Sequence, residues 1–191
     1  MLIEELPLGL SRYTSKLTIS AVPLLLGLEI LMLIAVLTIS DRCSQGLLTD
    51  TAGPAAVALL KTEWADAAFH TGLLADEEDE IATWLQDACS RGAALVLTVG
   101  GTGMSPRDRT PEATRRVIDR EAPGLAEAMR ANGAKSNQFA WLSRGVAGLS
   151  GSTLIVNLPG SKRGAHDSLE SILPLLRHAA EVACGGQSHP S

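Results

Sequence analysis

The sequence predicts an α/β fold with three layers, in which helices flank a mostly parallel sheet that includes a small β-hairpin. Three observations support this prediction. Aliphatic and β-branched segments alternate along the chain with segments whose apolar residues recur at helical spacing. Aromatic residues make up only 3% of the chain, so Leu, Val, Ile and Ala must build the core. One strand pattern, at residues 95–99, leads through a glycine-rich turn into the start of a helix.

The first strand is predicted at residues 32–39, inside a longer apolar run. Residues 17–39 are apolar apart from Glu29 and a few Ser and Thr residues, which is long enough for a membrane span. Pro23, Gly27 and Glu29 interrupt that run, and its last third is β-branched and aliphatic, as in a central parallel strand. We therefore expect a strand here and no transmembrane helix.

Residues 1–31 then form an N-terminal extension outside the domain. They lack a basic segment followed by a clean small-residue cleavage site, so a secretory signal is a poor match. The favoured hypothesis is that Met32 is the true start and that the extension comes from a misassigned start. The alternative is a genuine extension that packs as a helix or anchors to a membrane. The domain is predicted to span residues 32–184, followed by a disordered tail at 185–191.

The next elements follow from turn and helix signals. Residues 40–46 form a polar loop with turn chemistry, and a helix opens near Asp50 and runs to about Trp64. Residues 66–75 form a short, weakly patterned strand. The acidic run at 76–80 begins another helix, because carboxylates suit the positive end of its dipole. Its apolar residues recur every three or four positions and give one buried face: Ile81, Trp84, Leu85 and Ala88.

A buried strand at residues 93–99 ends in the glycine turn. Thr110 suits the N-cap of the following helix, Pro111 its first position and Glu112 its first turn. This helix is predicted to reach about Arg120.

The rest of the chain is predicted to contain two helices and a hairpin. One helix starts at Pro123 and ends near Lys135. Strands at 146–149 and 153–158 flank a turn at 150–152. The last helix runs from about 165 to 183, with an apolar stripe of Leu169, Ile172, Leu173, Leu176 and Ala180.

Composition and charge exclude several classes of function. The net charge is −5, so the chain has no basic surface for nucleic acid and none for a purely electrostatic membrane patch. The three cysteines are far apart and form no C-x-x-C pair, which argues against a zinc site or a disulfide framework. We expect reduced thiols and a cytoplasmic protein. The four histidines show no pair with metal-ligand spacing.

Three loops follow predicted strand ends, at residues 40–46, 100–109 and 157–164. Because the carboxyl ends of parallel strands share one edge of a sheet, their polar residues are expected to converge there. Ser40 and Asp41 come from the first loop. Asp76 follows another predicted strand, so its carboxylate is expected at the same edge of the sheet. Acidic residues at a helix start are, however, also ordinary partners of the helix dipole.

The glycine turn is the centre of the predicted site. Gly100, Gly101, Thr102 and Gly103 present backbone N–H groups ahead of a helix, an arrangement that suits a phosphate. Arg107 adds a cation, and Asp108 a carboxylate that would hold Mg²⁺. The turn is neither a Walker loop nor a dinucleotide fingerprint. The alternative interpretation is a tight strand-to-helix turn with an exposed loop acid.

Together these motifs resemble those of the molybdopterin adenylyltransferases, the Mog and MoaB group of molybdenum cofactor biosynthesis proteins. They occur in family order between about Met32 and Cys184. The matching segments are residues 37–42 with Gly46, Asp50 and Gly53, then 100–103, 106–108, 110–113, 123–124, 143–144 and 157–161.

The resemblance implies an adenylyl transfer that requires Mg²⁺ and ATP. The terminal phosphate of molybdopterin would attack the α-phosphate of ATP and give adenylyl-molybdopterin and pyrophosphate. It implies that Asp76 and Asp108 are the catalytic and metal-binding pair, and that the glycine turn, Arg107, Ser40 and Asp41 bind the nucleotide. It places pterin contacts at Ser143, Arg144, Asn157, Pro159, Gly160 and Ser161.

The resemblance also implies a homotrimer or a hexamer and a molybdate-insertion protein as partner. Two features depart from the family pattern. Ala75 replaces the proline that usually precedes the first aspartate, and Lys162 and Arg163 add cations after the last motif. The alternative function is therefore a molybdopterin-binding protein of the same pathway that lacks catalysis.

Overall fold

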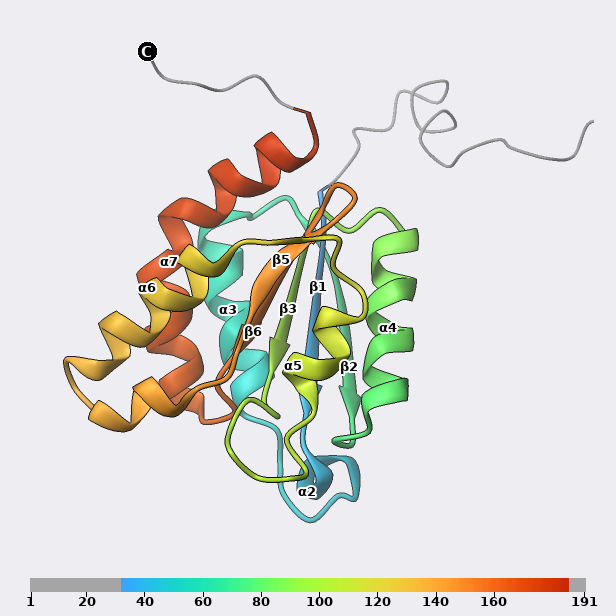
Figure 1. The fold of residues 1–191 in the computed structure, drawn as a ribbon. Coiled ribbons are helices and arrows are strands. Elements are labelled where there is room, and N and C mark those ends of the chain that lie inside the picture. Colours follow the sequence, from blue (N-terminus) through green and yellow to red (C-terminus); the bar gives the residue numbers. More distant parts are fainter. Residues whose placement is uncertain (1–31, 186–191) are drawn as a thin grey trace, which may run out of the picture. The chain divides into compact units, whose positions relative to one another are not determined.

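The computed structural model describes residues 32–185, and the predictions made for residues 1–31 and for the tail beyond 185 lie outside them. Within this part of the chain, one sheet has the strand order β2-β1-β3-β6-β5-β4 (Figure 1). The strands are β1 (Leu33–Ile39), β2 (Ala68–Leu74), β3 (Leu95–Val99), β4 (Arg120–Glu121), β5 (Ala147–Ser150) and β6 (Thr153–Leu158). Strands β2, β1, β3 and β6 are parallel, and β5 and β4 are antiparallel to their neighbours. The predicted fold class is confirmed.

Helices cover both faces of this sheet. Helices α3 (Ala52–Glu63), α6 (Pro123–Ala134) and α7 (Lys162–Ala183) pack on one face, and α4 (Glu78–Ser90) and α5 (Thr110–Arg115) on the other (Figure 1). Successive side chains of a strand point to opposite faces. Accordingly, Ile34 and Val36 of β1 pack in the core beneath α3, α6 and α7. Ala35 and Leu37 pack in the core on the opposite face, beneath α4 and α5.

The hairpin and most helices match the prediction, with boundaries within a few residues. Strands β5 and β6 pair in antiparallel register, and Gly151 occupies their turn at φ +57°. Three short elements were not predicted: α2 (Asp41–Ser44), β4, and the 3-10 helix η1 (Gln138–Leu142). Such short elements depend on tertiary contacts more than on local pattern.

Two predictions around α5 are wrong. The helix ends at Arg115 and not near Arg120, because the chain turns there to pair β4 with β5. Thr110 is the first residue of the helix and not its N-cap, which is Arg109. The Thr110 hydroxyl is buried and donates to the Gly100 carbonyl oxygen at 2.9 Å, so it anchors the glycine turn.

Among residues 32–185, none of the helices is both long enough and apolar enough to cross a membrane.

Candidate active site

The loops after β1, β2, β3 and β6 meet at the carboxyl edge of the sheet, as predicted. The Ser40 amide donates to the Leu74 carbonyl oxygen at 2.9 Å, which joins the first two loops. A Cβ atom on Gly160 would lie 3.1 Å from the Gly100 Cα atom, so the last two loops are in direct contact. The edge thus gathers polar groups from segments far apart in the sequence.

The glycine turn requires glycine at its first two positions. Gly100 has φ +114° and Gly101 has φ +62°, both in conformations that other residues rarely adopt. A Cβ atom at position 100 would lie 2.1 Å from the Ile39 carbonyl oxygen, and one at 101 would lie 2.7 Å from Asp76 Oδ1. The absence of side chains therefore lets the turn approach both β1 and Asp76.

The G100A substitution is expected to lower the free energy of unfolding by about 3 kcal/mol, because both the backbone angle and the Ile39 contact must change. The matched control is G46A, since Gly46 also has a positive φ, +72°, but nothing lies within 4 Å of its Cβ position. That control should lose only about 1–2 kcal/mol. Urea unfolding of both variants checks the difference, and equal losses would contradict the close contact at Gly100.

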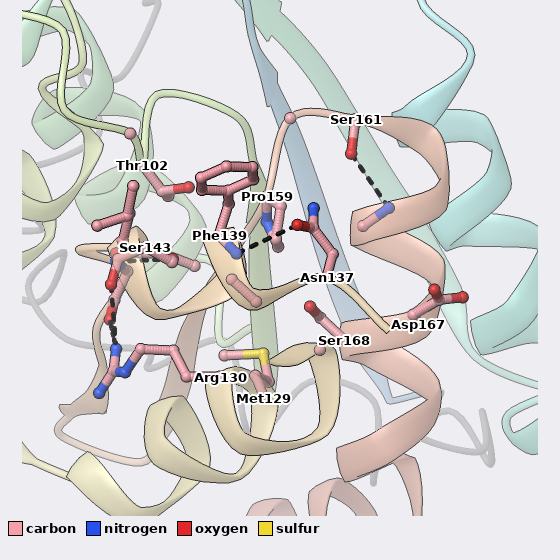
Figure 2. Close-up of a pocket in the computed structure, with 18 of the residues that line it drawn as sticks. Thr102, Met129, Arg130, Asn137, Phe139, Ser143, Pro159, Ser161, Asp167 and Ser168 are labelled. Atoms are coloured by element: carbon pink, nitrogen blue, oxygen red, sulfur yellow. Dashed lines mark hydrogen bonds between the residues drawn. The ribbon is translucent and has the colours of Figure 1, made fainter. Parts of the chain in front are cut away.

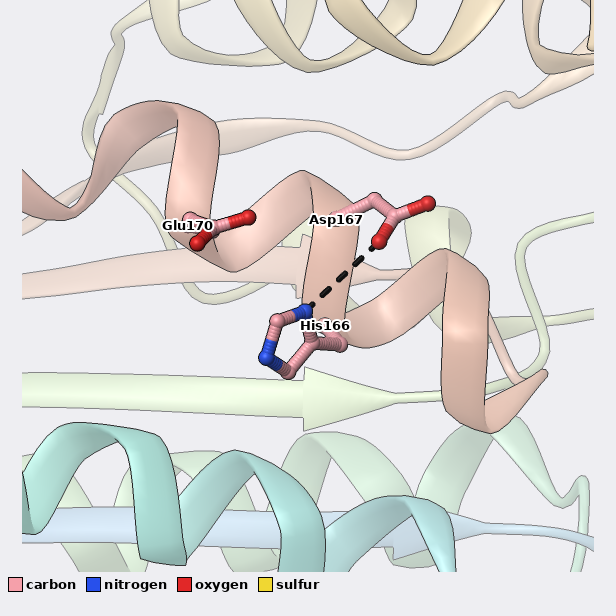
Figure 3. Close-up of side chains that lie close together, drawn as sticks. All are labelled: His166, Asp167 and Glu170. Atoms are coloured by element: carbon pink, nitrogen blue, oxygen red, sulfur yellow. Dashed lines mark ion pairs between the residues drawn. The ribbon is translucent and has the colours of Figure 1, made fainter. Parts of the chain in front are cut away.

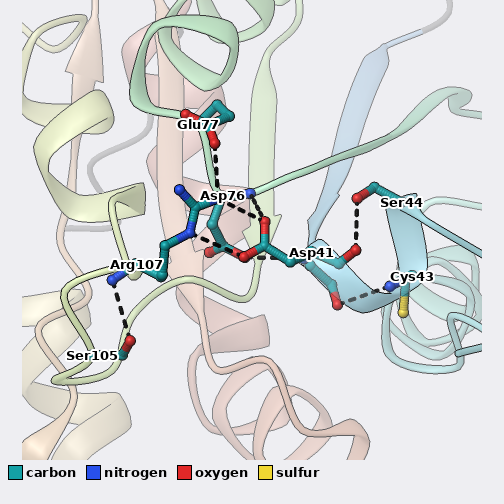
Figure 4. Close-up of polar contacts among 8 residues, drawn as sticks. Asp41, Cys43, Ser44, Asp76, Glu77, Ser105 and Arg107 are labelled. Atoms are coloured by element: carbon teal, nitrogen blue, oxygen red, sulfur yellow. Dashed lines mark hydrogen bonds and ion pairs between the residues drawn. The ribbon is translucent and has the colours of Figure 1, made fainter. Parts of the chain in front are cut away.

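Three carboxylates lie beside this turn. Asp76 is buried, and its Oδ2 accepts a hydrogen bond from the Asp41 amide at 3.2 Å. The Asp41 Oδ1 atom accepts in return from the Asp76 amide at 3.1 Å, so the loops after β1 and β2 fix each other (Figure 4). Asp108 Oδ2 accepts from the Ser105 amide at 2.8 Å and would lie 2.9 Å from a Cβ on Gly103. The Asp108 carboxylate therefore lies against the turn.

Asp76 is in an unfavourable electrostatic position. Its Oδ1 atom is buried and has no hydrogen-bond partner. Burial raises the pKa of Asp76, and the charges of Asp41 and Asp108 raise it further, against the opposing hydrogen bond from the Asp41 amide and the charge of Arg107. A buried, unpaired oxygen flanked by two carboxylates fits a hard divalent cation, which prefers oxygen ligands.

Arg107, predicted to bind phosphate, is paired with carboxylates in this structure. Its Nε and one terminal nitrogen donate to the two oxygens of Asp41 at 3.1 and 2.9 Å, and it also donates to Glu77 at 2.8 Å (Figure 4). The hydrogen bonds and charge of Arg107, together with the hydrogen bond from the Asp76 amide, lower the pKa of Asp41. The Arg107 side chain is about half exposed, so its guanidinium stands at the rim of the carboxylate group.

A cavity of about 650 Å³ opens beside the turn (Figure 2). Its walls come from the loop after β3, from α6 and η1, and from the start of α7. Five of the six residues predicted to contact a pterin line it: Ser143, Asn157, Pro159, Gly160 and Ser161. Its size suits a small organic ligand.

The sixth of these residues, Arg144, is not part of the lining. Its guanidinium contacts the backbone at the end of the glycine turn and beyond it, where it donates to the carbonyl oxygens of Gly103 and Asp108. Asn157 contributes to the wall, but its side chain is only 1% exposed and is already bonded within the protein. Its Oδ1 accepts from the Val146 amide, and its Nδ2 donates to the hydroxyls of Thr98 and Thr114.

These bonds give Asn157 a structural role that a substitution can test. N157A is expected to lower the free energy of unfolding by about 2–4 kcal/mol, because it leaves the buried Val146 amide without an acceptor. N137A is the control, since exposed Asn137 only caps η1 through the Phe139 amide and should lose about 1 kcal/mol. Chemical denaturation measures both. An N157A variant of normal stability would contradict the structural role.

Several site residues were not predicted. Glu77 falls within an acidic run that looks like a plain helix start, so its pairing with Arg107 has no local signal. Met129, Asn137 and Phe139 line the cavity from α6 and the segment that follows it. No motif marks those positions, and the packing of α6 against α7 and η1 brings them to the site.

A second group of ionisable residues lies on α7. His166, Asp167 and Glu170 have potential ligand atoms within 4.8 Å of one another, and His166 Nδ1 lies 3.6 Å from Asp167 (Figure 3). All three lie on one helix, and His166 and Glu170 are exposed. This arrangement is typical of a solvated helix face, and we assign it no metal.

Comparison with known proteins places this geometry in a family. The model for the probable molybdopterin binding domain matches residues 35–178. The molybdopterin adenylyltransferase of Helicobacter pylori strain J99 is 38% identical over 154 residues, which cover 80% of this chain and 88% of that protein. The molybdenum cofactor synthesis protein cinnamon of Drosophila melanogaster is 40% identical over 151 residues, which cover 77% of this chain. The chain spans only 25% of the length of cinnamon.

Solved structures agree with this match. The molybdopterin biosynthesis enzyme MoaB from Thermus thermophilus superposes with a TM-score of 0.74 at 46% identity, over 81% of this chain and 98% of that one. The molybdopterin biosynthesis Mog protein from Mycobacterium ulcerans gives a TM-score of 0.74 at 38% identity, over 80% and 99% of the two chains. The chain therefore belongs to the molybdopterin-binding domain family, in its Mog and MoaB group.

Proposed function

We propose that this protein catalyses the transfer of AMP from ATP to molybdopterin, a step of molybdenum cofactor biosynthesis. One observation carries the proposal: the buried, unpartnered Oδ1 of Asp76 lies beside a glycine turn that also lines the cavity. The Helicobacter pylori relative, of which this chain covers 88%, is a molybdopterin adenylyltransferase, and this supports the same reaction.

In this reaction, an oxygen of the terminal phosphate of molybdopterin attacks the α-phosphorus of ATP. A new phosphorus–oxygen bond forms, the bond from the α-phosphorus to the oxygen that bridges to the β-phosphate breaks, and pyrophosphate leaves. The attacking phosphate is already anionic at neutral pH, so no general base is needed. The protein must instead hold two anionic substrates together and balance their charge.

The residues divide this work between the two ends of the site. The amides of Gly101, Thr102 and Gly103 bind phosphate oxygens of the nucleotide, whereas the Gly100 amide donates to the Leu158 carbonyl oxygen at 3.1 Å and fixes the turn to the end of β6. The start of α7, capped by Ser161 and followed by the cations Lys162 and Arg163, attracts the phosphate of molybdopterin. The cavity between them receives the pterin.

Asp76 and Asp108 are the residues that would hold Mg²⁺, with Asp41 beside them. When bound, the cation neutralises phosphate charge near the reacting atoms. Ser40 positions this group by accepting from the Cys43 amide at 3.3 Å, which shapes α2 next to Asp41. Arg107, now paired with Asp41 and Glu77, would exchange these partners for a phosphate of the nucleotide.

The departure at Ala75 does not displace Asp76. The Asp76 amide still bonds Asp41, and the Glu77 amide donates to the Ala75 carbonyl oxygen at 2.8 Å, which closes the turn without proline. This geometry favours catalysis over the alternative of a pterin-binding protein that lacks it.

The proposal includes an assembly and a location. A homotrimer or hexamer, and delivery of the product to a molybdate-insertion protein, follow from the family resemblance. The exposed apolar side chains of Phe139, Trp141 and Leu142 offer contact surface for such partners. A cytoplasmic location is consistent with the free thiols of Cys43, Cys89 and Cys184.

Pyrophosphate release tests the proposal. The full chain, incubated with ATP, Mg²⁺ and molybdopterin, should release pyrophosphate, and omission of any one of the three should abolish the release. Molybdopterin binding without pyrophosphate release would establish the non-catalytic alternative.

A further inference from the structure

We propose that Arg144 is a positioning residue that holds the Asp108 loop, residues 103–108, against the wall of the cavity and thereby couples molybdopterin binding to Mg-ATP binding. The inference rests on the proposed function, because it concerns the two ends of that site. It assigns Arg144 no contact with either substrate.

A single guanidinium holds both ends of the Asp108 loop. Nε of Arg144 donates to the Gly103 carbonyl oxygen at 2.6 Å, and one terminal nitrogen donates to the Asp108 carbonyl oxygen at 2.5 Å. The Arg144 amide also donates to the Thr102 carbonyl oxygen at 2.9 Å. Between these ends, Met104 and Arg107 are exposed. The position of the Asp108 carboxylate therefore depends on a residue 36 positions away in the sequence.

Glu112 keeps this guanidinium in place. The remaining terminal nitrogen of Arg144 donates to Glu112 Oε1 at 2.5 Å. Burial by itself would raise the pKa of Glu112, but the hydrogen bond and the charge of Arg144 outweigh it and lower the pKa. Glu112 thus stays ionised at neutral pH, and the planar arginine fork satisfies three acceptors at once. A lysine ammonium cannot reproduce this geometry.

The other side of Arg144 belongs to the cavity. Its neighbours Ser143 and Gly145 line the cavity, and Arg130 of α6 donates to the carbonyl oxygens of both, at 3.4 and 3.1 Å. The short segment 143–145 is therefore fixed to the cavity wall through α6 and to the Asp108 loop through Arg144. A ligand that further restrains this segment therefore also restrains Asp108. By thermodynamic linkage, molybdopterin and Mg-ATP must then tighten each other's binding by the same factor.

The test is the R144K substitution, with Mg-ATP binding measured by calorimetry in the presence and absence of molybdopterin, using α,β-methylene-ATP as the nucleotide so that no AMP is transferred during the titration. In the wild type, molybdopterin should tighten Mg-ATP binding about 5-fold or more. In R144K, the Kd of Mg-ATP alone should rise about 10-fold, and the tightening by molybdopterin should disappear. The Kd of molybdopterin measured without nucleotide should change less than about 3-fold, a split that a general loss of structure would not produce.

R116K is the matched control. Arg116 is also an arginine with carboxylate partners, Glu78 and Asp79, but it is exposed and lies outside the site. It should leave both affinities unchanged. If R144K fails to fold, E112Q provides the second variant, because it removes the charge that orients Arg144. It should weaken Mg-ATP binding and the coupling in the same direction, by a smaller factor.

Two results would overturn the inference: a wild type in which molybdopterin leaves the Kd of Mg-ATP unchanged, or a folded R144K with wild-type affinity and coupling. If the wild type binds both substrates and transfers AMP, either of these results contradicts only the role of Arg144. A wild type that binds both without transfer contradicts the proposed function, and the coupling is still measured.

Discussion

D108N is expected to reduce kcat for adenylyl transfer by about 10³-fold while the protein remains folded. Asparagine has the shape of aspartate, and its amide oxygen can still accept from the Ser105 amide, so the loop should be kept. What is lost is the negative charge beside the glycine turn, which we propose holds Mg²⁺ next to the phosphates. Steady-state pyrophosphate release measures the loss.

D119N is the matched control for this prediction. Asp119 also accepts a backbone hydrogen bond, from the Gly151 amide at 2.7 Å, but it is exposed and lies directly before β4, beside the β5–β6 turn and away from the carboxyl edge of the sheet. It should retain the wild-type kcat. A D108N variant within about 5-fold of wild type would show that Asp108 is only a loop residue.

D76N is expected to reduce kcat for adenylyl transfer by about 10³-fold and to make the fold more stable. The ionised Asp76 carboxylate is buried, and one of its oxygens is unpaired. Removing the charge should therefore raise Tm by about 2–4 °C at pH 7.5, an example of a stability cost carried by a functional site. Calorimetry and the activity assay on the same preparation check both effects.

The stability gain should also depend on pH, with a defined sign. Because burial and the neighbouring carboxylates raise the pKa of Asp76, its ionised form opposes folding above that pKa. Below the ordinary aspartate pKa of about 4, both states of the chain are protonated and the cost vanishes. The Tm difference between D76N and wild type should thus shrink as the pH falls from 7.5 toward 4. A lower Tm for D76N at pH 7.5 would contradict the proposed electrostatic strain.

Much of the fold follows from local pattern. Strands β1, β3 and β6 are continuous aliphatic runs because both of their faces are covered, and such runs are visible in a sequence. Strand β2 lies at the sheet edge and is only partly buried, which explains its weak pattern. Element α2 was not visible, because four residues form a helix only with the help of the Ser40 cap.

The parts of the candidate site that depend on glycine and backbone geometry could be predicted from the sequence. The contacts that long side chains make in the site could not. The turn at Gly100 and Gly101 has a local signal, since positive φ angles and close approach require glycine. Arg107 and Arg144 both belong to sequence motifs that point to the site, residues 106–108 and 143–144. Which carboxylate or carbonyl each one reaches depends on the three-dimensional arrangement of loops, and no spacing rule gives it.

The most direct test of the account follows the α-phosphate itself. Wild-type protein is mixed with Mg²⁺, molybdopterin and ATP labelled at the α-phosphate, and the products are separated. We expect label on the pterin in a one-to-one ratio with unlabelled pyrophosphate, and no such product with D108N. Label that stays in ATP, or appears only in free AMP, while the wild type binds molybdopterin normally, would contradict it.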